Sequence, residues 1–298
     1  MKTMNLSITS PLQDYELLDF ANGRKLERFG DVVVERPAPH AHNKPQLSHW
    51  QPDWIYTGTR VTDGEWQAQR DDLPRHWQIE MAGQVMHCRL GKGGQVGIYP
   101  EHAACWQWLR QRLEGYDNVD KIRLLNLFAG TGGATLAAVQ AGAHVTHVDA
   151  QVSQLELARL NVGDQGARFI KENVMTYVER MIRKGERYHM VIMDPPSFGR
   201  ADKGKVWDIR NDFKPLISVL PRLVTQDCRG IWVSLHTQAM KAEGIASLIN
   251  EVMHGEAQPL QLGTKTVTGK VLTAGVAAIW QDDREMDPDA RTASLRSK

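Results

Sequence analysis

The chain has 298 residues and 42% hydrophobic content, which is enough to bury the core of one large or two modest folded domains. The 36 Lys and Arg residues are balanced by 35 Asp and Glu, so the formal net charge of +1 does not favour a nucleic-acid partner unless a local basic patch exists. No stretch approaches the roughly 18 apolar residues of a membrane span and the N-terminus lacks a signal peptide, so we expect a cytoplasmic protein with no membrane partner.

Up to residue 95 the sequence consists of short alternating segments separated by Gly, Pro and Asn or Asp turns, as is typical of strands. They read DYELLDFA, DVVVERP, WIYTG, HWQIEMA and QVMHCRL, and they predict a small β-rich domain over residues 1–95. Four of the nine tryptophans fall in this part, without basic residues interleaved at a fixed spacing, so core packing is favoured over base stacking. These are Trp50, Trp54, Trp66 and Trp77.

From Pro100 the pattern becomes helical, and from residue 123 strands and helices alternate strictly. Strands are expected at residues 123–128, 144–150, 167–173, 188–194 and 230–237, with helices between them. Five such βα repeats predict a parallel, doubly wound, Rossmann-like sheet over residues 96–298. Residues 260–281 look like two adjacent strands joined by a Gly-containing turn, followed by a charged tail.

The glycine turn after the first of these strands indicates a nucleotide-like ligand. In an open α/β sheet a ligand lies at the carboxyl ends of the strands, and Gly130, Gly132 and Gly133 allow its close approach to the backbone there. Asp149 ends the second strand, where a carboxylate can accept hydrogen bonds from both hydroxyls of a ribose. Asn173, or its neighbour Glu172, could contact an adenine edge from the third. The third glycine of the dinucleotide fingerprint is missing, which argues against a nicotinamide enzyme.

The fourth strand delivers the sequence DPPSF, which indicates the chemistry. The two prolines fix φ and remove two backbone donors, so Asp194 and the carbonyl of Pro195 form an acceptor-only loop at the ligand edge of the sheet. Such a loop would hold the N–H groups of a base and turn a nitrogen lone pair toward an electrophilic methyl group. Phe198 would stack on that base, a contact worth about 1–3 kcal/mol.

FAGTGG, VDA and DPPSF, in this order, resemble the class I S-adenosylmethionine-dependent methyltransferases over roughly residues 97 to 280. More narrowly, GIYPEHAACWQWL, DPPSFGR and GKVW are similar to the bacterial family related to large-subunit (23S) ribosomal RNA methyltransferases, which carry a small β-rich domain ahead of the catalytic one. The resemblance implies S-adenosylmethionine as cofactor and ribosomal RNA as the partner. The cofactor residues expected on this basis are Phe128, Ala129, Gly130, Thr131, Gly132, Asp149, Ala150, Asn173 and Asp194. The expected catalytic residues are Asp194, Pro195, Pro196 and Phe198.

One departure from relatives that methylate cytosine C5 concerns the nucleophile. Those enzymes need a cysteine beside the proline pair or after the fifth strand, where this sequence has Ser197 and the run Ser234 to Thr237, and Cys228 precedes that strand. A nitrogen target is therefore expected. All three cysteines are far apart and odd in number, so we expect buried, reduced thiols and no metal site.

Two further features carry alternative interpretations. His236 could take a proton from the methylated nitrogen, although a polar strand cap is favoured. The segment GRADKGKVWDIRNDF carries Arg200, Lys203, Lys205 and Arg210 with Trp207 and Phe213, and either a surface for bases and phosphates or an ordinary lid would fit.

The sequence thus predicts an enzyme that methylates a nucleobase, expected to be a nitrogen in ribosomal RNA. The alternatives are a methyltransferase for small molecules or proteins, and a non-catalytic RNA-binding protein that keeps the fold.

Overall fold

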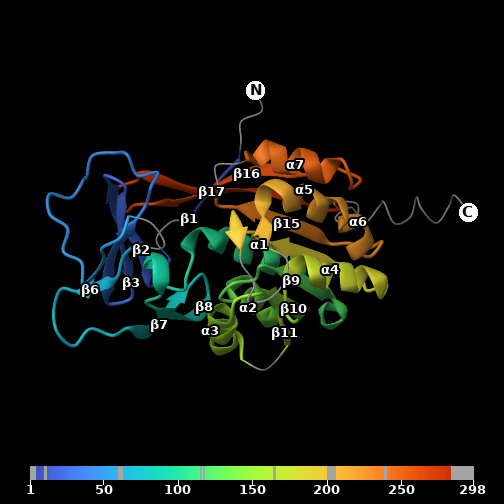
Figure 1. Cartoon of the computed structure of the whole chain (residues 1–298), viewed down its shortest axis with the longest axis horizontal. Helices are drawn as coiled ribbons and strands as arrows, with labels where there is room; N and C mark the ends of the chain where they lie inside the picture. Colours follow the sequence, from blue (N-terminus) through green and yellow to red (C-terminus); the bar gives the residue numbers. More distant parts are fainter. Residues whose placement is uncertain are drawn as a thin grey trace, which may run out of the picture.

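The computed structural model describes residues 5–9, 12–59, 63–114, 116, 118–163, 166–199, 206–237 and 240–282. Its centre is a mixed eight-stranded sheet in the order β1-β16-β17-β15-β12-β9-β10-β11 (Figure 1). The five predicted parallel strands are confirmed as β9 (Arg123–Leu127), β10 (His144–Asp149), β11 (Ala167–Lys171), β12 (Met190–Met193) and β15 (Gly230–Leu235). The two C-terminal strands are β16 (Gln258–Lys265) and β17 (Val271–Trp280), which pair antiparallel as expected.

Helices cover both faces of this sheet, which is why its strands are apolar on both sides. Neighbouring residues of β9 illustrate the division, because Leu124 belongs to the core under α1 and α2 and Leu125 to the core under α4 to α7. The helices are α1 (Ala103–Leu113), α2 (Gly133–Gln140), α3 (Val152–Val162), α4 (Val174–Arg183), α5 (Ile209–Ser218), α6 (Leu220–Leu223) and α7 (Ala242–Asn250). None of these helices in the described part of the chain is long and apolar enough to cross a membrane. The Rossmann-like class expected from the sequence is confirmed.

The N-terminal part is strand-rich, as predicted. It contains a five-stranded sheet in the order β2-β3-β4-β5-β6 and a separate hairpin of β7 and β8. The strands are β2 (Tyr15–Ala21), β3 (Arg24–Phe29), β4 (Val32–Pro37), β5 (Trp54–Tyr56), β6 (Trp66–Ala68), β7 (His76–Met81) and β8 (Gln84–Arg89). The sequence interpretation missed β3 and β6, because β3 is dominated by charged residues and β6 has only three residues.

The four tryptophans of this region have the structural role that the sequence favoured. Trp54 is buried, and Trp66 and Trp77 pack against the main core. Each of the four indole N–H groups donates within the protein, including Trp77 to the carbonyl of Phe29 at 2.9 Å and Trp50 to Asp19 at 3.1 Å. Buried or half-buried indoles with satisfied donors stabilise the fold.

Strands β2, β3 and β4 of the five-stranded sheet carry a buried ion cluster centred on Glu27, whose side chain is fully buried. Glu27 accepts hydrogen bonds from Arg36 at 2.5 Å, Lys25 at 2.9 Å and the hydroxyl of Tyr15 at 3.1 Å. Burial alone would raise the pKa of Glu27, yet the charges of Arg36 and Lys25 lower it to about 2.

The strand-rich region is tied to the large sheet in two ways. The unpredicted strand β1 (Asn5–Thr9) leaves that region and pairs parallel with β16. In return, the β16–β17 hairpin reaches the strand-rich region (Figure 1), where Lys270 donates to the carbonyls of Phe20 at 2.7 Å and Lys44 at 3.0 Å. One hydrophobic core also runs through both parts. The division into domains at residues 95 and 96 stays a prediction, with β1 lying across it.

Candidate active site

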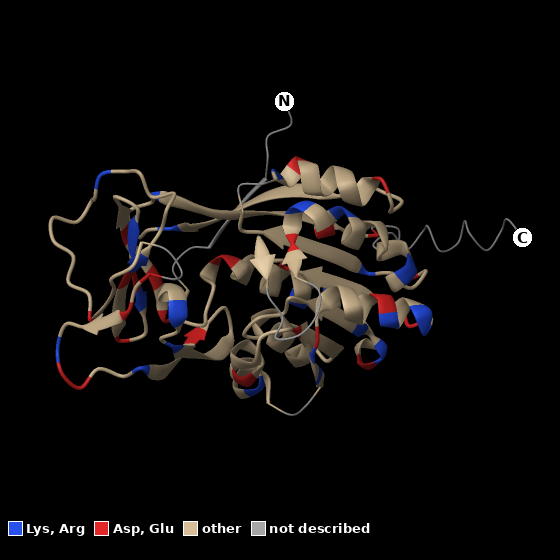
Figure 2. Cartoon of the chain, viewed as in Figure 1, with Lys and Arg blue, Asp and Glu red and all other residues tan. Residues whose placement is uncertain are grey.

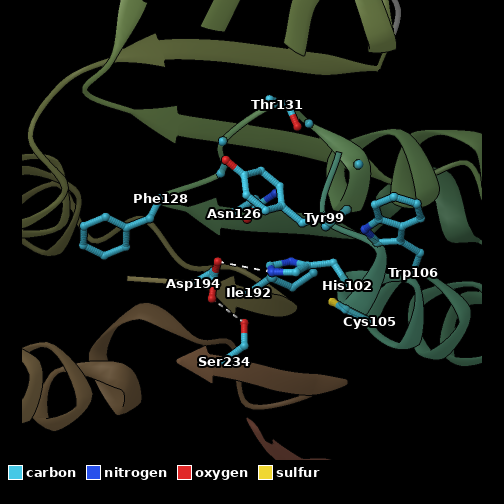
Figure 3. A pocket seen from close by; sticks show the side chains of 15 residues that line it. Tyr99, His102, Cys105, Trp106, Asn126, Phe128, Thr131, Ile192, Asp194 and Ser234 are labelled. Carbon is cyan, nitrogen blue, oxygen red and sulfur yellow. Dashed lines mark hydrogen bonds and ion pairs between the residues drawn. The ribbon is translucent and has the colours of Figure 1, made fainter. Parts of the chain in front are cut away.

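A pocket lies at the carboxyl ends of β9 and β12, the edge at which ligands of open α/β sheets bind (Figure 3). It is partly open to solvent, so a ligand can reach it from this edge of the sheet. Its lining consists of Tyr99, His102, Cys105, Trp106, Asn126, Phe128, Ala129, Gly130, Thr131, Gly132, Gly133, Ala134, Ile192, Asp194 and Ser234. The glycine turn and the first residue of DPPSF, 64 positions apart in the sequence, therefore face one space.

The three glycines of the turn have different roles. Gly130 has φ of +57° and no atom within 4 Å of the place where a Cβ would be, so its backbone faces open space. A Cβ on Gly132 would lie 3.1 Å from the Cβ of Ala158, and one on Gly133 would lie 2.2 Å from the indole of Trp106. Gly130 thus permits ligand approach, whereas the other two permit helix packing.

Phe128 has a positive φ of +53°, a strained conformation for a bulky residue. Its ring packs against Trp207, with ring centroids 4.7 Å apart, and Figure 3 shows it directed away from Tyr99 and His102. The Trp207 indole in turn donates to the carbonyl of Pro196 at 2.7 Å. Phe128 therefore supports the Asp-Pro-Pro loop through Trp207, and it also belongs to the pocket lining.

Asp149 lies next to the turn but not in the pocket lining. Its carboxylate accepts from the backbone N–H of Gly130 at 2.9 Å and of Gln151 at 2.8 Å, and it is 8% exposed. Burial raises its pKa, while these donors oppose the rise. A carboxylate has about four acceptor sites, so two hydrogen bonds leave capacity for ribose hydroxyls.

Asn173 and Ala150 also lie outside the lining. Asn173 is the N-cap of α4, where its side-chain oxygen accepts from the backbone N–H of Thr176 at 3.2 Å. Glu172 pairs with Arg180 instead of facing a ligand. The structure shows Asn173 as a helix cap, and its adenine-binding role stays a prediction.

The aromatic and basic side chains in and after the loop that follows β12 agree only in part with the expected RNA-binding roles. Phe198 is 53% exposed, as a base-stacking side chain would need to be. Trp207 and Phe213 are 3% and 1% exposed, so the idea that they stack on RNA bases was wrong: they belong to the core beneath α4 to α7. Arg210 is held by Asp208 through contacts of 2.6 and 3.0 Å. Arg200, Lys203 and Lys205 lie outside the described residues.

Asp194 is surrounded by polar side chains that the sequence interpretation did not expect. Ser234 donates to its Oδ1 at 2.8 Å, Nε2 of His236 lies 3.2 Å from the same oxygen, and Nε2 of His102 lies 3.4 Å from Oδ2 (Figure 3 draws the contacts of Ser234 and His102). The two imidazole rings stack, with Nε2 atoms 2.8 Å apart. Burial alone would raise the pKa of Asp194, yet the charge of His236, the charge that His102 gains at low pH, and the hydrogen bonds from His236 and Ser234 lower it to about 2.

The two histidines titrate in opposite directions. For His236, burial favours the neutral form, but the carboxylates of Asp194 and Glu101 together raise its pKa to about 10. For His102, burial and the nearby His236 lower the pKa more than the carboxylates of Asp194 and Glu101 raise it. At neutral pH His236 is therefore an imidazolium and His102 is neutral. Since a cation cannot accept another proton, the structure does not support His236 as the proton acceptor.

The same groups raise the question of a metal ion. Among the described residues, Glu101, His102 and His236 bring one ligand atom each within 4.8 Å of one another. Two nitrogens bound to a tetrahedral zinc would lie about 3.4 Å apart at the usual Zn–N length of about 2.05 Å. The 2.8 Å between the two Nε2 atoms fits a shared hydrogen instead.

The pocket wall opposite the sheet is the part that the sequence interpretation missed. It is formed by Tyr99, His102, Cys105 and Trp106, from the segment that joins the strand-rich region to β9. All four residues lie in the run GIYPEHAACWQWL, which carries part of the family resemblance. This run was the sequence signal that could have revealed them, although none of the expected site residues came from it. Burial raises the pKa of the Cys105 thiol well above its usual value, so it is no thiolate nucleophile.

The other two cysteines follow the expectation as well. Cys88 and Cys228 are free and buried, like Cys105. Burial raises the pKa of Cys228 to about 12, and it lies before β15, on the side away from the pocket.

Comparisons with known proteins agree with this geometry. A family model described as S-adenosylmethionine-dependent methyltransferase matches residues 57–261. The chain is 31% identical over 152 residues to ribosomal RNA large subunit methyltransferase K of Neisseria meningitidis, covering 49% of this chain and 41% of that protein. It is 31% identical over 186 residues to ribosomal RNA large subunit methyltransferase I of Photobacterium profundum, covering 59% and 44%. The chain thus spans less than half the length of these relatives.

A solved structure covers much more. The S-adenosylmethionine-dependent methyltransferase from Agrobacterium tumefaciens superimposes with a TM-score of 0.86 at 28% identity. The match includes 94% of this chain and 97% of that one, so the strand-rich region is part of the shared architecture.

Proposed function

Because this chain belongs to the S-adenosylmethionine-dependent methyltransferase family, we propose that it transfers the methyl group of that cofactor to a nucleobase nitrogen in large-subunit ribosomal RNA. The observation that carries the proposal is that the glycine turn after β9 and the Asp-Pro-Pro loop after β12 line one pocket. These relatives are named as methyltransferases of large-subunit ribosomal RNA, which supports the choice of partner, and a ribosomal RNA substrate implies work in the cytoplasm.

The residues present fit S-adenosylmethionine. The open space over Gly130 admits the ligand, and Asp149 beside it supplies an acidic group for the ribose hydroxyls. The N-terminus of α2, which begins at Gly133 in the pocket lining, favours a carboxylate such as that of the methionine moiety. The remaining contacts expected of Phe128, Ala129, Thr131, Gly132, Ala150 and Asn173 are part of the proposal.

When bound, S-adenosylmethionine supplies an electrophilic methyl group. Asp194 accepts a hydrogen bond from the target amino group and so orients the nitrogen lone pair, and Pro195 and Pro196 keep that loop rigid. Phe198, which is largely exposed, stacks on the base. The acceleration comes mainly from holding the nitrogen in line with the methyl group.

A nitrogen target is favoured over C5 of cytosine. Ser197 and Ser234 occupy the positions where a C5 enzyme needs its cysteine, and Ser234 donates to Asp194 instead of acting as a nucleophile. Cys105 lines the pocket, but its raised pKa keeps it a thiol.

The basic surface for RNA is weakly marked on the described residues. Figure 2 shows Lys and Arg distributed over both regions with Asp and Glu among them, which agrees with the net charge of +1. RNA affinity should then depend on a limited number of phosphate contacts and fall moderately with salt.

The proposal is tested in two steps. Calorimetry should detect binding of S-adenosylmethionine to the purified protein, and absence of any binding heat would remove the enzyme function. Nucleoside mass mapping of ribosomal RNA from a strain lacking the gene should then show one missing N-methylated nucleoside. The wild-type gene should restore it and Asp194→Asn should not. Loss of 5-methylcytidine instead would show that the nitrogen assignment is wrong.

A further inference from the structure

The two histidines beside Asp194 have no role in the function proposed so far. We propose that Asp194 receives the proton released by the target nitrogen and passes it to His102, while His236 remains a permanent cation that keeps Asp194 ionised. The proposal rests on the proposed function and narrows its substrate, because it requires a target nitrogen that carries a hydrogen, such as the amino group of a base.

His236 is held as a cation by its surroundings. Its Nδ1 lies 2.7 Å from the carbonyl of Ala274, which can only accept, so Nδ1 carries a hydrogen. A Cβ on Gly275 would lie 2.7 Å from the same Nδ1, so the ring is closely packed on that side. On the other side, Nε2 faces Oδ1 of Asp194 at 3.2 Å and Nε2 of His102 at 2.8 Å. Because the ionised carboxylate can only accept, Nε2 carries the second hydrogen and the ring is doubly protonated.

Glu101 stabilises the same cation, with its Oε1 3.7 Å from Nδ1 of His236 and its side chain only 12% exposed. The strength of this environment is reflected in the pKa of His236, which the two carboxylates raise to about 10 against the effect of burial. His236 therefore keeps its proton at neutral pH.

His102 is placed to act as the base. It lies on the pocket wall, and its Nε2 is 3.4 Å from Oδ2 of Asp194, the oxygen that neither Ser234 nor His236 contacts in the distances above. Its side chain is 17% exposed, so a proton can pass on to water. The neighbouring titratable groups are Glu101, Cys105, Asp194, His236 and Tyr99, whose ring centroid lies 5.9 Å away. Burial and the His236 cation lower the pKa of His102 against the opposite effect of the Asp194 and Glu101 carboxylates, so it is neutral at pH 7.

The chemical step balances as follows. The lone pair of the amino nitrogen forms a bond to the methyl carbon, and the carbon–sulfur bond breaks with its electron pair remaining on sulfur. The nitrogen becomes cationic, its N–H bond breaks toward Oδ2 of Asp194, and the electron pair stays on nitrogen. The His102–His236 hydrogen bond opens, the proton moves from Asp194 to Nε2 of His102, and water removes it. Asp194 returns to the carboxylate because the imidazolium of His236 beside it disfavours the neutral acid.

The charge assignment is tested without cofactor or RNA. Nitrogen-15 NMR of the histidine rings in the full chain, assigned with His102→Gln and His236→Gln, should show His236 as an imidazolium from pH 6 to 9 and His102 as neutral at pH 7. A neutral His236 or a cationic His102 at pH 7 would overturn the proposal. This result does not depend on whether the protein methylates RNA.

The proton path is tested by single-turnover methylation of RNA as a function of pH. In the wild type the logarithm of the rate should rise with pH with a slope of one below the pKa of His102 and level off above it. His102→Gln should lose this acid limb and react about 10²-fold more slowly, the usual loss for a general base. Imidazole should restore part of the rate of His102→Ala and none of that of His236→Ala. His144→Gln, an exposed histidine at the start of β10, is the matched control and should behave as the wild type.

Calorimetry with S-adenosylmethionine serves to check that each variant keeps a folded pocket. His102→Asn provides a second neutral substitution at the same position. A His102→Gln variant that retains both the rate and the acid limb would overturn the proton path alone. A wild type that binds the cofactor but methylates no RNA would overturn the proposed function, and the proton path with it.

Discussion

Two glycines only three positions apart allow cofactor binding and packing to be separated. A Cβ at Gly133 would lie 2.2 Å from Cζ2 and 2.6 Å from Cε2 of Trp106, which is only 3% exposed and cannot move into solvent. A Cβ at Gly130 would meet no atom within 4 Å, but its residue has φ of +57°. We therefore expect Gly133→Ala and Gly130→Ala to lose stability for different reasons.

The magnitudes follow from these contacts. Overpacking costs about 1–3 kcal/mol, and alanine recovers roughly 0.5–1 kcal/mol in a helix, so Gly133→Ala should lose about 1–2 kcal/mol of unfolding free energy. Gly130→Ala should lose a similar amount, about 1–2 kcal/mol, because alanine is strained in the left-handed region. Only Gly130→Ala places a methyl group in the space over the turn, so it alone should weaken S-adenosylmethionine binding at least about 10-fold, equivalent to roughly 1.4 kcal/mol.

Urea denaturation and calorimetry measure the two effects, and Trp106→Phe provides the control. In that background the loss from Gly133→Ala should nearly disappear, a coupling of about 1–2 kcal/mol, while the loss from Gly130→Ala should persist. If Gly130→Ala binds the cofactor as tightly as the wild type, the ligand does not lie over the turn. If Gly133→Ala unfolds like the wild type, α2 does not pack on Trp106 as described.

Three other predictions concern stability and thiol reactivity. Glu27→Gln should destabilise the protein by about 3–5 kcal/mol in urea denaturation, because it leaves Arg36 and Lys25 without their buried partner. Glu16→Gln, in a partly exposed pair with Arg28, should cost less than about 1 kcal/mol. Burial lowers the pKa of His147 from 6.5 to about 3, so its neutral form stabilises the fold above pH 6.5 and this contribution is lost as the pH falls toward 3. The wild type should then lose about 1.4 kcal/mol per pH unit more than His147→Leu between pH 6 and 4, and equal slopes would contradict the assignment. Ellman's reagent should label none of the three buried cysteines in the native protein and all three after denaturation, and a fast-reacting native thiol would refute their burial.

The sheet and its ligand edge could be predicted because their signals are local. Alternating strand and helix periods, a glycine turn after a strand and a proline pair after another each occupy a few consecutive residues. From these the positions of Gly130 and Asp194 at one edge follow directly, since parallel strands share their carboxyl ends. The same reasoning could not separate the roles of Gly130 and Gly133, which depend on Trp106, a residue from a different helix.

What escaped prediction depends on partners distant in the sequence. The five residues of β1 have no strand signal strong enough to reveal pairing with β16, about 250 residues later. The two histidines of Asp194 come from the segments before α1 and after β15, 134 residues apart, and only the folded chain brings them together. The charge on His236 could not be inferred either, because it requires the positions of Asp194, Glu101 and the carbonyl of Ala274.

The wall formed by Tyr99, His102, Cys105 and Trp106 has a consequence for the evolution of this protein. One side of the pocket comes from the segment that leads out of the strand-rich region. If that region and this segment were replaced by those of another protein, the pocket would lose this wall. The family match, which begins at residue 57 within the strand-rich region, agrees with joint inheritance.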